Sequence, residues 1–223
     1  MIRAVIFDMD GLMFETEQVA FQMLQTACAK RGLQFTIDIK RQMCGANFEA
    51  SAQIFANAFG AIDPAYTYDI CWSAVRKDME KLFAEQGIPC KPGLRELLDF
   101  LSDHGIKTAV ASGSARHVVQ QYIEMADLAE YFPVTIGGGD FLQPKPSPES
   151  FLLAAERLAV SASECLVLED SSRGLEAAHC AGMHAIWIPD LDIPRQEVVE
   201  KVDAVCETLT DVIPWLKAQN SLL

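Results

Sequence analysis

Three features that would assign this 223-residue chain to a familiar class are missing from its sequence. No apolar run approaches the roughly 18 residues that a membrane-spanning helix needs, so no membrane partner is expected. Lys and Arg number 18 against 31 Asp and Glu and form no cluster, so a nucleic-acid partner is not expected either. The third missing feature is a cysteine framework, because the count of seven is odd and no CxxC pair occurs. Cysteines without such a pattern are typical of reduced core residues, which favours a cytoplasmic protein.

What the sequence does contain is a globular composition, with 50% apolar and 22% charged residues. A chain of this length forms one large domain, or one domain with an insertion. The net charge of −13 repels phosphorylated molecules at long range, so any site for one must be locally positive. These numbers do not give the oligomeric state, and they are compatible with a monomer.

The order of secondary structure predicts an interrupted α/β domain. Residues 3–7 form a short β-branched and aromatic run typical of a buried strand, and the next comparable run is 107–111. Between these two runs the sequence looks helical. Apolar residues recur there at helical spacing within residues 19–28, 54–59 and 71–83.

Beyond residue 93, helical and strand patterns alternate. Alternating β–α units form a parallel, doubly wound sheet. The expected fold class is therefore α/β, with a doubly wound core of residues 1–14 and 88–223 and an inserted helical domain of residues 15–87. Residues 161–164 have the pattern of a capping box, but a strand follows them, so we expect a turn.

Polar side chains stand where the predicted strands end. They are Asp8 and Asp10 after the first strand, Ser112 after the second, Lys145 before a helix near Ser147, and Glu169 and Asp170 after the fourth. Ligands bind at the carboxyl ends of the strands in an open α/β sheet. Several carboxylates in one crevice repel each other unless a cation binds there. Carboxylates with few other ligands suit Mg²⁺.

The same residue types favour phosphoryl chemistry. Asp8 is a candidate nucleophile toward phosphorus, since aspartate forms phosphoenzymes. Mg²⁺ and Lys145 would neutralise the charge of the transferring group. Asp10 is a candidate acid for the leaving oxygen and a candidate base for water. Gly11 lets the backbone approach the site closely.

Four segments together resemble the motifs of the haloacid dehalogenase (HAD) superfamily. Residues 8–17, DMDGLMFETE, are similar to its first motif, DxDGxxxD(S/T)E. Residues 110–114 resemble the second motif, residues 145–148 the KPxP of the third, and residues 168–171 the acidic pair of the fourth. The motifs occur in order, and the resemblance covers essentially the whole chain. It implies a HAD-like, Rossmann-type core with a helical cap between the first two motifs.

The resemblance also implies roles for the matching residues. Asp8 would be the nucleophile and a metal ligand. Asp10 would be the acid and base, and would bind the metal through its backbone carbonyl. Ser112 and Lys145 would bind the phosphoryl group.

The other roles concern the metal and the substrate. Asp170 would bind Mg²⁺ directly, and Glu169 would bind it through water. Glu15 departs from the Asp that the family usually has, which puts the hydrogen bonds of the hinge in doubt. The substrate-binding candidates are Gly11, Thr16, Gly45, Ala46, Asn47, Gly113 and Ser114, with Arg76 or Lys77 as a cationic candidate in the cap.

These roles predict a Mg²⁺-dependent phosphatase that hydrolyses a small phosphorylated metabolite, a sugar phosphate or similar compound, through an aspartyl-phosphate. The alternative is a sugar phosphomutase similar to β-phosphoglucomutase, which keeps all four motifs. Dehalogenase and phosphonatase chemistry are disfavoured by Asp10, and a non-catalytic binding protein is disfavoured by the intact polar set. Where the mutase branch carries a cap His and a cap Arg, this chain has Ala20 and Phe48, which favours hydrolysis.

Overall fold

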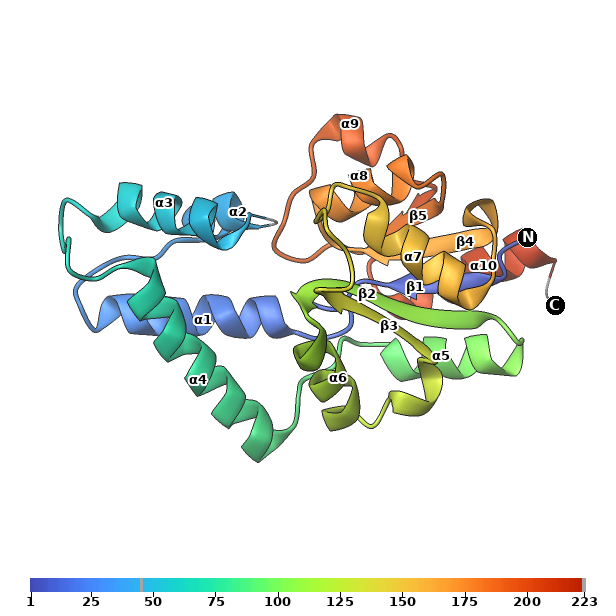
Figure 1. The fold of residues 1–223 in the computed structure, drawn as a ribbon, viewed down its shortest axis with the longest axis horizontal. Coiled ribbons are helices and arrows are strands. Elements are labelled where there is room, and N and C mark those ends of the chain that lie inside the picture. The colour runs from blue at the N-terminus through green and yellow to red at the C-terminus, as the bar shows by residue number, and fades with distance from the viewer. Residues whose placement is uncertain (45, 222–223) are drawn as a thin grey trace.

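Six strands form one parallel sheet in the computed structural model, which describes residues 1–44 and 46–221 (Figure 1). The strands are β1 (Ala4–Phe7), β2 (Lys107–Ala115), β3 (Val134–Gly138), β4 (Cys165–Glu169), β5 (His184–Trp187) and β6 (Ala204–Val205). They lie in the order β3-β2-β1-β4-β5-β6. The chain runs outward from β1 on one side and from β4 on the other, which places a crevice at the carboxyl ends of these two strands. The predicted doubly wound α/β sheet is confirmed.

Helices cover both faces of the sheet, because each buried strand directs alternate side chains to opposite sides. In β1, Val5 and Phe7 pack on one face, and Ala4 and Ile6 pack on the other. The first face is covered by α5 (Leu94–Asp103), α6 (Arg116–Met125) and α10 (Val212–Asn220). The second face is covered by α7 (Glu149–Leu158), α8 (Ser172–Cys180) and α9 (Gln196–Val199). Short 3₁₀ helices occur at Ala129–Tyr131, Ala162–Glu164 and Leu209–Asp211, the second of them in the stretch expected to be a turn.

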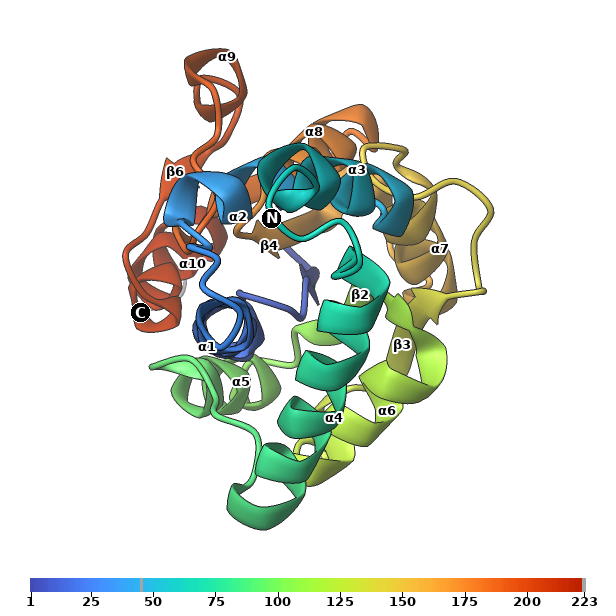
Figure 2. The ribbon, with the colours of Figure 1, turned by 90° about the vertical axis from the view of Figure 1, so that its left-hand side faces the viewer.

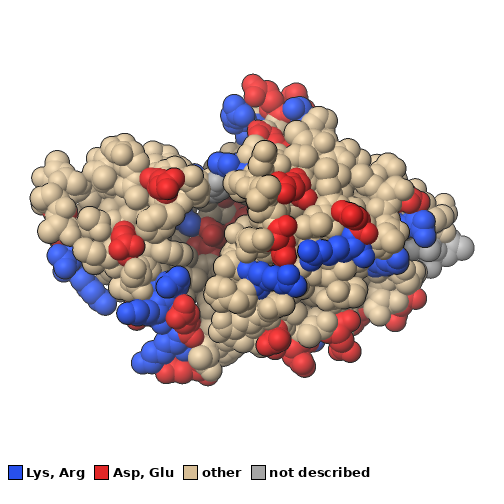
Figure 3. Space-filling view, viewed as in Figure 1, with Lys and Arg blue, Asp and Glu red and all other residues tan. Residues whose placement is uncertain are grey.

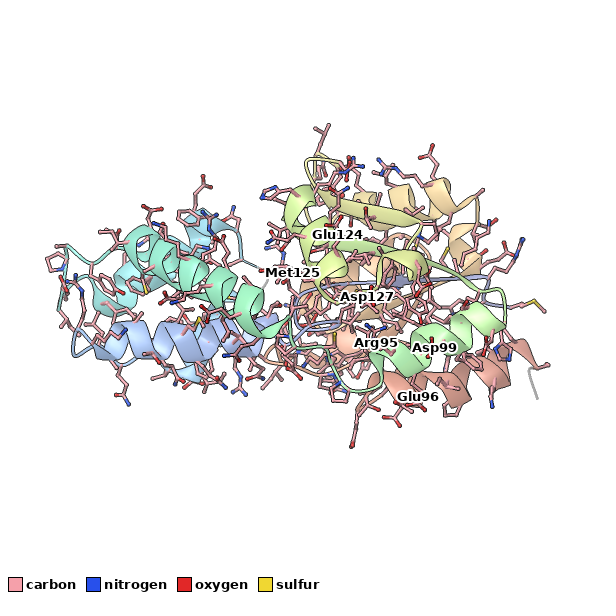
Figure 4. The ribbon with its side chains drawn as sticks, turned by 90° about the horizontal axis from the view of Figure 1, so that it is seen from below. Arg95, Glu96, Asp99, Glu124, Met125 and Asp127 are labelled. Carbon is pink, nitrogen blue, oxygen red and sulfur yellow. The ribbon has the colours of Figure 1, made fainter. Side chains whose placement is uncertain are left out.

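Arg95 joins two helices on the first face of the sheet (Figure 4). Its guanidinium donates to the carbonyl oxygens of Ala126, at 2.5 Å, and Asp127, at 3.4 Å, just beyond the end of α6. Asp127 has a φ of 55°, in the left-handed region, where the helix has already ended. Since α6 follows β2 directly, this contact holds the β2–α6 unit against α5.

The cap consists of four helices inserted between β1 and α5. They are α1 (Thr16–Ala29), α2 (Ile37–Met43), α3 (Phe48–Phe59) and α4 (Tyr68–Gln86). Figure 2 shows them in front of the sheet, over the carboxyl ends of its strands. Helix α2 was not predicted because seven residues are too few to show a helical period. It begins after Thr36, whose side chain accepts a hydrogen bond from the backbone N–H of Ile39 at 3.4 Å.

Two short linkers connect the cap to the core, and they pair with each other. Phe14 and Cys90 form an antiparallel bridge. The backbone N–H of Glu15 donates to the carbonyl of Pro89 at 2.9 Å, and that of Lys91 donates to the carbonyl of Met13 at 2.8 Å. The two linkers therefore form one connection between cap and core.

All seven cysteines are free thiols, as the lack of a pairing pattern predicts. The expectation that they are core residues is wrong for Cys90 and Cys180, which are exposed. Within residues 1–44 and 46–221, no helix has the length and apolarity needed to cross a membrane.

Candidate active site

Two aspartates follow β1 at the carboxyl edge of the sheet, and they have different partners. Lys145 Nζ donates to Asp8 Oδ1 at 2.5 Å. Asp10 accepts from two hydroxyls instead, with Thr16 Oγ1 at 2.8 Å from Oδ1 and Ser114 Oγ at 2.7 Å from Oδ2. One carboxylate is therefore paired with a cation and the other with neutral donors.

The end of β2 supplies the hydroxyls. Ser112 is buried, and its Oγ lies 3.4 Å from Asp10 Oδ2 and accepts from the backbone N–H of Ser114 at 3.0 Å. The strand continues to Ala115, beyond its predicted end, with an irregular register opposite β3. This extension brings Ser114 to Asp10 as well.

Lys145 bridges carboxylates from two strands. Its Nζ donates to Glu169 Oε1 at 2.7 Å as well as to Asp8, and it lies 4.5 Å from the centroid of the Phe151 ring. Arg173 fastens the loop, because its Nε donates to the backbone carbonyl of Lys145 at 2.8 Å. The ammonium group is thus held between β1 and β4.

Glu169 is the last residue of β4 and Asp170 follows it, and the two carboxylates differ in their contacts. Both oxygens of Glu169 are engaged, Oε1 by Lys145 and Oε2 by the backbone N–H and hydroxyl of Ser171, at 2.7 and 2.9 Å. Gly174 makes this arrangement possible, since a Cβ there would lie 1.6 Å from Glu169 Oε1. Asp8, Glu169 and Asp170 each offer one carboxylate oxygen to a group whose members all lie within 4.8 Å of one another.

Burial dominates the electrostatics of this cluster. It raises the pKa of Asp8 to about 7, although the Lys145 ammonium opposes the shift, and Glu169 adds to it. Burial and the repulsion of Glu169 and Asp8 raise the pKa of Asp170 well above its usual value. The pKa of Asp10 is also raised by burial, against its hydroxyl hydrogen bonds. Burial lowers the pKa of Lys145, but the two carboxylates raise it by more, so the side chain stays charged.

The acidic cluster fits a hard divalent cation. Carboxylate oxygens are the ligands that Mg²⁺ prefers, and a cation would relieve their mutual repulsion. Gly11, with a φ of 84°, lets two carboxylates pack closely against the backbone, because a Cβ there would lie 2.5 Å from Asp170 Oδ2 and 3.0 Å from Asp190 Oδ2. Asp190 Oδ2 is buried and has no hydrogen-bond partner among the described residues. The donor set and the unpartnered oxygen both suit a hydrated metal ion.

A cavity of about 430 Å³ lies between the cap and the carboxyl edge of the sheet. Figure 3 shows the recess between these two parts of the molecule, with acidic side chains inside it. The core wall includes Asp8, Asp10, Ser112, Gly113, Ser114, Lys145, Glu169, Asp170, Arg173 and Asp192. The cap wall includes Glu17, Leu24, Lys40, Met43, Cys44, Ala46, Asn47, Ser51, Tyr68 and Trp72. A cavity of this size holds a small molecule.

Lys40 gives the cap wall a positive charge. Lys40 is 8% exposed, and its Nζ forms an ion pair with the carboxylate of Glu17. Burial lowers the pKa of Lys40, but Glu17 raises it by more, so the ammonium persists. Lys145 lies on the opposite wall, so each wall has one ammonium group. The lining nevertheless holds six carboxyl groups against three cationic side chains, so the expected excess of positive charge is not found in the cavity.

The sequence profile of the family described as haloacid dehalogenase-like hydrolase matches residues 5–188. The chain belongs to this family. A phosphorylated carbohydrates phosphatase of Thermotoga maritima is 32% identical over 186 residues, which cover 83% of this chain and 84% of that protein. (DL)-glycerol-3-phosphatase 2 of Arabidopsis thaliana is 32% identical over 213 residues, covering 90% and 86%. The structure of a beta-phosphoglucomutase from Clostridium difficile matches with a TM-score of 0.74 at 21% identity, covering 99% and 98%, which is a likeness of fold.

These matches confirm the expected HAD family and the expected enzyme class, a phosphoric monoester hydrolase. The HAD fold also brings most of the predicted site residues together. Those at the cavity are Asp8, Asp10, Ser112, Lys145, Glu169, Asp170, Ala46, Asn47, Gly113 and Ser114. Thr16 and Gly11 are not part of the lining. Thr16 donates to Asp10, and Gly11 lets Asp170 approach the backbone closely. Gly45 lies outside the described residues.

The cationic candidates in the cap are placed differently. Arg76 and Lys77 are exposed on α4, away from the lining of the cavity, and Arg76 pairs with Glu80 at 3.6 Å. Sequence reasoning missed Lys40 as the cation of the cap wall. Its only signal is its place in the cap, because a Lys in a short helix matches no motif.

Two positions bear on the mutase alternative. Ala20 is buried in α1 and has no polar side-chain atom. Phe48 is 50% exposed at the start of α3, with its ring centroid 5.3 Å from that of Tyr68. Neither residue can supply the proton transfer or the bidentate phosphate contact of a His or an Arg.

Proposed function

We propose that this HAD hydrolase is a Mg²⁺-dependent phosphatase of small phosphorylated carbohydrates, acting through an aspartyl-phosphate on Asp8. One observation carries the proposal. Asp8, Asp10, Lys145 and Asp170 converge at the carboxyl edge of the sheet, on the floor of a cavity of about 430 Å³ that the cap covers. Such a floor can bind, attack and protonate one phosphate ester.

In the first step, an oxygen of Asp8 attacks phosphorus and forms the acyl-phosphate bond while the ester P–O bond breaks. The leaving oxygen takes a proton from Asp10, whose raised pKa favours the protonated form. Lys145 and the hydroxyl of Ser112 bind the phosphoryl oxygens and stabilise the charge that develops on them.

In the second step, water attacks the phosphorus of the acyl-phosphate. Asp10, now deprotonated, takes the proton from that water, and the bond from phosphorus to Asp8 breaks. Inorganic phosphate is released and the Asp8 carboxylate is regenerated, so the two steps together consume one water.

The metal would be held by the carboxylates of Asp8 and Asp170 and by the backbone carbonyl of Asp10. When bound, Mg²⁺ supplies positive charge that offsets the charge of the phosphoryl group and of the carboxylates. Both oxygens of Glu169 already accept hydrogen bonds, which supports an indirect role through water and through Lys145.

The relatives and the cap wall support a carbohydrate substrate. A phosphorylated carbohydrates phosphatase and a glycerol-3-phosphatase are each 32% identical to this chain. The cap wall offers Lys40 and Asn47 as donors and Glu17 as an acceptor beside Tyr68 and Trp72. Hydroxyl-rich molecules bind to such mixtures of polar groups and aromatic faces.

The proposal is tested by measuring phosphate release from an array of small sugar and polyol phosphates, with Mg²⁺ and with EDTA. We expect Mg²⁺-dependent release from some members of the array, and none from the Asp8→Asn variant. A coupled assay for glucose 6-phosphate formed from β-glucose 1-phosphate tests the mutase alternative. Mutase turnover well above phosphate release would replace the phosphatase assignment.

A further inference from the structure

Asp190 is a buried carboxylate that the proposed reaction does not use. It follows β5, and its side chain is 2% exposed. Its two oxygens differ, because Oδ1 accepts two hydrogen bonds and Oδ2 has no donor among residues 1–44 and 46–221. A buried carboxylate oxygen without a donor is costly, so a group that donates to it is expected when the site is complete.

The unpartnered oxygen faces the acidic cluster. It lies 3.0 Å from the point where a Cβ of Gly11 would stand, and Asp170 Oδ2 lies 2.5 Å from the same point. Asp190 is not part of the group of carboxylate oxygens within 4.8 Å of one another, which is Asp8, Glu169 and Asp170. It lies beside Asp170 without belonging to the group that would bind a metal.

The other oxygen is tied to the cap and its linkers. Lys91 Nζ, from the second linker, donates to Asp190 Oδ1 at 2.8 Å, and Gln18 Nε2, from α1, donates to it at 3.2 Å. Lys91 Nζ also lies 3.1 Å from Glu15 Oε2, in the first linker. The carboxylate of Asp190 therefore stands between both linkers of the cap and the acidic cluster.

We propose that Asp190 is a positioning residue whose Oδ2 accepts a hydrogen bond from a water molecule bound to the metal ion. A metal-bound water is a strong hydrogen-bond donor, and Asp190 Oδ2 lies close to Asp170, a residue that would bind the metal. The anchored Oδ1 keeps the carboxylate aimed at that water. Through Lys91 and Gln18, the hydration shell of the metal is thereby connected to the position of the cap.

The inference rests on the proposed function, since it needs a metal at the acidic cluster, and metal binding tests it directly. We would titrate the full chain with Mn²⁺, follow the loss of the free-ion EPR signal, and obtain Mg²⁺ affinity by competition. The Asp190→Asn variant places a donor or a weaker acceptor beside the water, so we expect metal affinity to fall about 10- to 100-fold. At saturating Mg²⁺, kcat should return to within about threefold of wild type, a recovery that a disrupted fold would not allow.

The Glu15→Gln variant is the matched control. It removes one negative charge from the same ion-pair network and leaves Asp190 in place, so its metal affinity should stay within about twofold of wild type. An equal loss in Glu15→Gln and Asp190→Asn would overturn the proposal, because charge and not a hydrogen bond would then explain both.

A second variant covers the case in which Asp190→Asn does not fold. The Asp190→Asn/Lys91→Met double variant removes both partners of the ion pair and leaves no unpaired buried charge. We expect the same loss of metal affinity in this variant. Wild-type metal affinity in either folded variant would refute the role of Asp190 and leave the proposed function intact. A wild-type protein that binds neither Mn²⁺ nor Mg²⁺ would refute both the role of Asp190 and the proposed function.

Discussion

The core and the cap line the same cavity with walls of different character. In the core wall, charged and hydroxyl groups contact one another directly, as in the contacts of Lys145 with Asp8 and Glu169 at 2.5 and 2.7 Å. The cap wall is largely apolar and aromatic, and Lys40 with Glu17 is the ion pair that it contributes among the described residues. We therefore expect the core wall to react with a phosphoryl group and the cap wall to accept the rest of the substrate.

The two walls also differ in how they are held. The core residues follow strands whose parallel pairing fixes the position of each carboxyl end. The cap is joined through two linkers and side-chain contacts such as Gln18 with Asp190 and Arg41 with Leu191. Changes in the core wall should therefore abolish chemistry, and changes in the cap wall should alter substrate preference.

The largest effect is expected from Asp8→Asn. Asn has nearly the same shape but cannot form an acyl-phosphate, so turnover should fall by at least ~10³-fold, which is about 4 kcal/mol of barrier. The measurement is kcat/KM for the best sugar phosphate, together with circular dichroism and Tm.

Asp103→Asn is the control for this variant. Asp103 is exposed near the end of α5 and is not part of the cavity lining, so activity should stay within twofold of wild type, roughly the scatter expected of a surface change. Wild-type turnover in a folded Asp8→Asn protein would show that Asp8 is not the nucleophile.

The next effect concerns the stability of the metal-free core. The pKa of Asp8 is raised to about 7 in the folded protein, so the carboxylate form is disfavoured there relative to the unfolded chain. Stability is then greatest below the unfolded pKa of about 4 and falls as the pH rises through about 7. In EDTA, we expect Tm to be several degrees lower at pH 8 than at pH 5, at about 2–4 °C per kcal/mol.

Mg²⁺ should reverse this trend, because it favours the ionised carboxylates. The Asp8→Asn variant is the control, since it lacks the titrating group and should show a smaller fall in Tm between pH 5 and pH 8. A Tm in EDTA that rises across this range would contradict the raised pKa of Asp8 in the folded protein.

The same difference between the walls explains what could be predicted from the sequence. Asp8 and Asp10 follow a buried strand immediately, and the parallel sheet places them with Ser112 at one edge, so the core site was predictable before any distance was known. The close contacts between side chains at this site could not be predicted from the sequence. Two of the residues involved depend on packing between elements: Gly174, which makes room for Glu169, and Asp190, which lies 20 residues beyond Asp170 and outside all four motifs.

The sequence predicts that the cap is helical, but it does not predict which cap residues line the cavity. Periodicity identified the buried face of α4, where Cys71, Val75, Met79 and Phe83 recur every four residues. It could not tell which end of α4 reaches the cavity. Tyr68 and Trp72 do, at its beginning, whereas Arg76 and Lys77 lie further along on the exposed side. The orientation of a helix above a site depends on linkers and packing that no motif records.

A medium effect is expected from Lys40→Met in the cap wall. Losing a charge-assisted hydrogen bond to the substrate should lower kcat/KM for a sugar phosphate about tenfold. Acetyl phosphate is too small to reach the cap, so its hydrolysis should change less than about threefold. The measurement is the ratio of kcat/KM for the two substrates, which separates recognition by the cap from chemistry in the core.

Lys77→Met is the matched control, because it removes the same charge from an exposed position on α4 that is not part of the cavity lining. We expect both substrates to be hydrolysed at wild-type rates. An equal loss on acetyl phosphate and on the sugar phosphate in Lys40→Met would place Lys40 in the chemistry and remove the distinction between the two walls.

The smallest effect is expected where the walls touch, at Arg41. Its Nε donates to the carbonyl of Leu191 at 3.4 Å, a long hydrogen bond between α2 and the loop after β5, and the side chain is 42% exposed. A contact of this kind contributes about 0.5–1 kcal/mol, so Arg41→Met should raise KM about two- to fivefold and leave kcat nearly unchanged. The measurement is steady-state kinetics of Arg41→Met and of Arg76→Met, which removes an exposed Arg of α4. The comparison separates the loss of this contact from the loss of a positive charge. A change of tenfold or more in Arg41→Met alone would mean that cap closure depends on this one contact, and the cap would then control the rate as well as the choice of substrate.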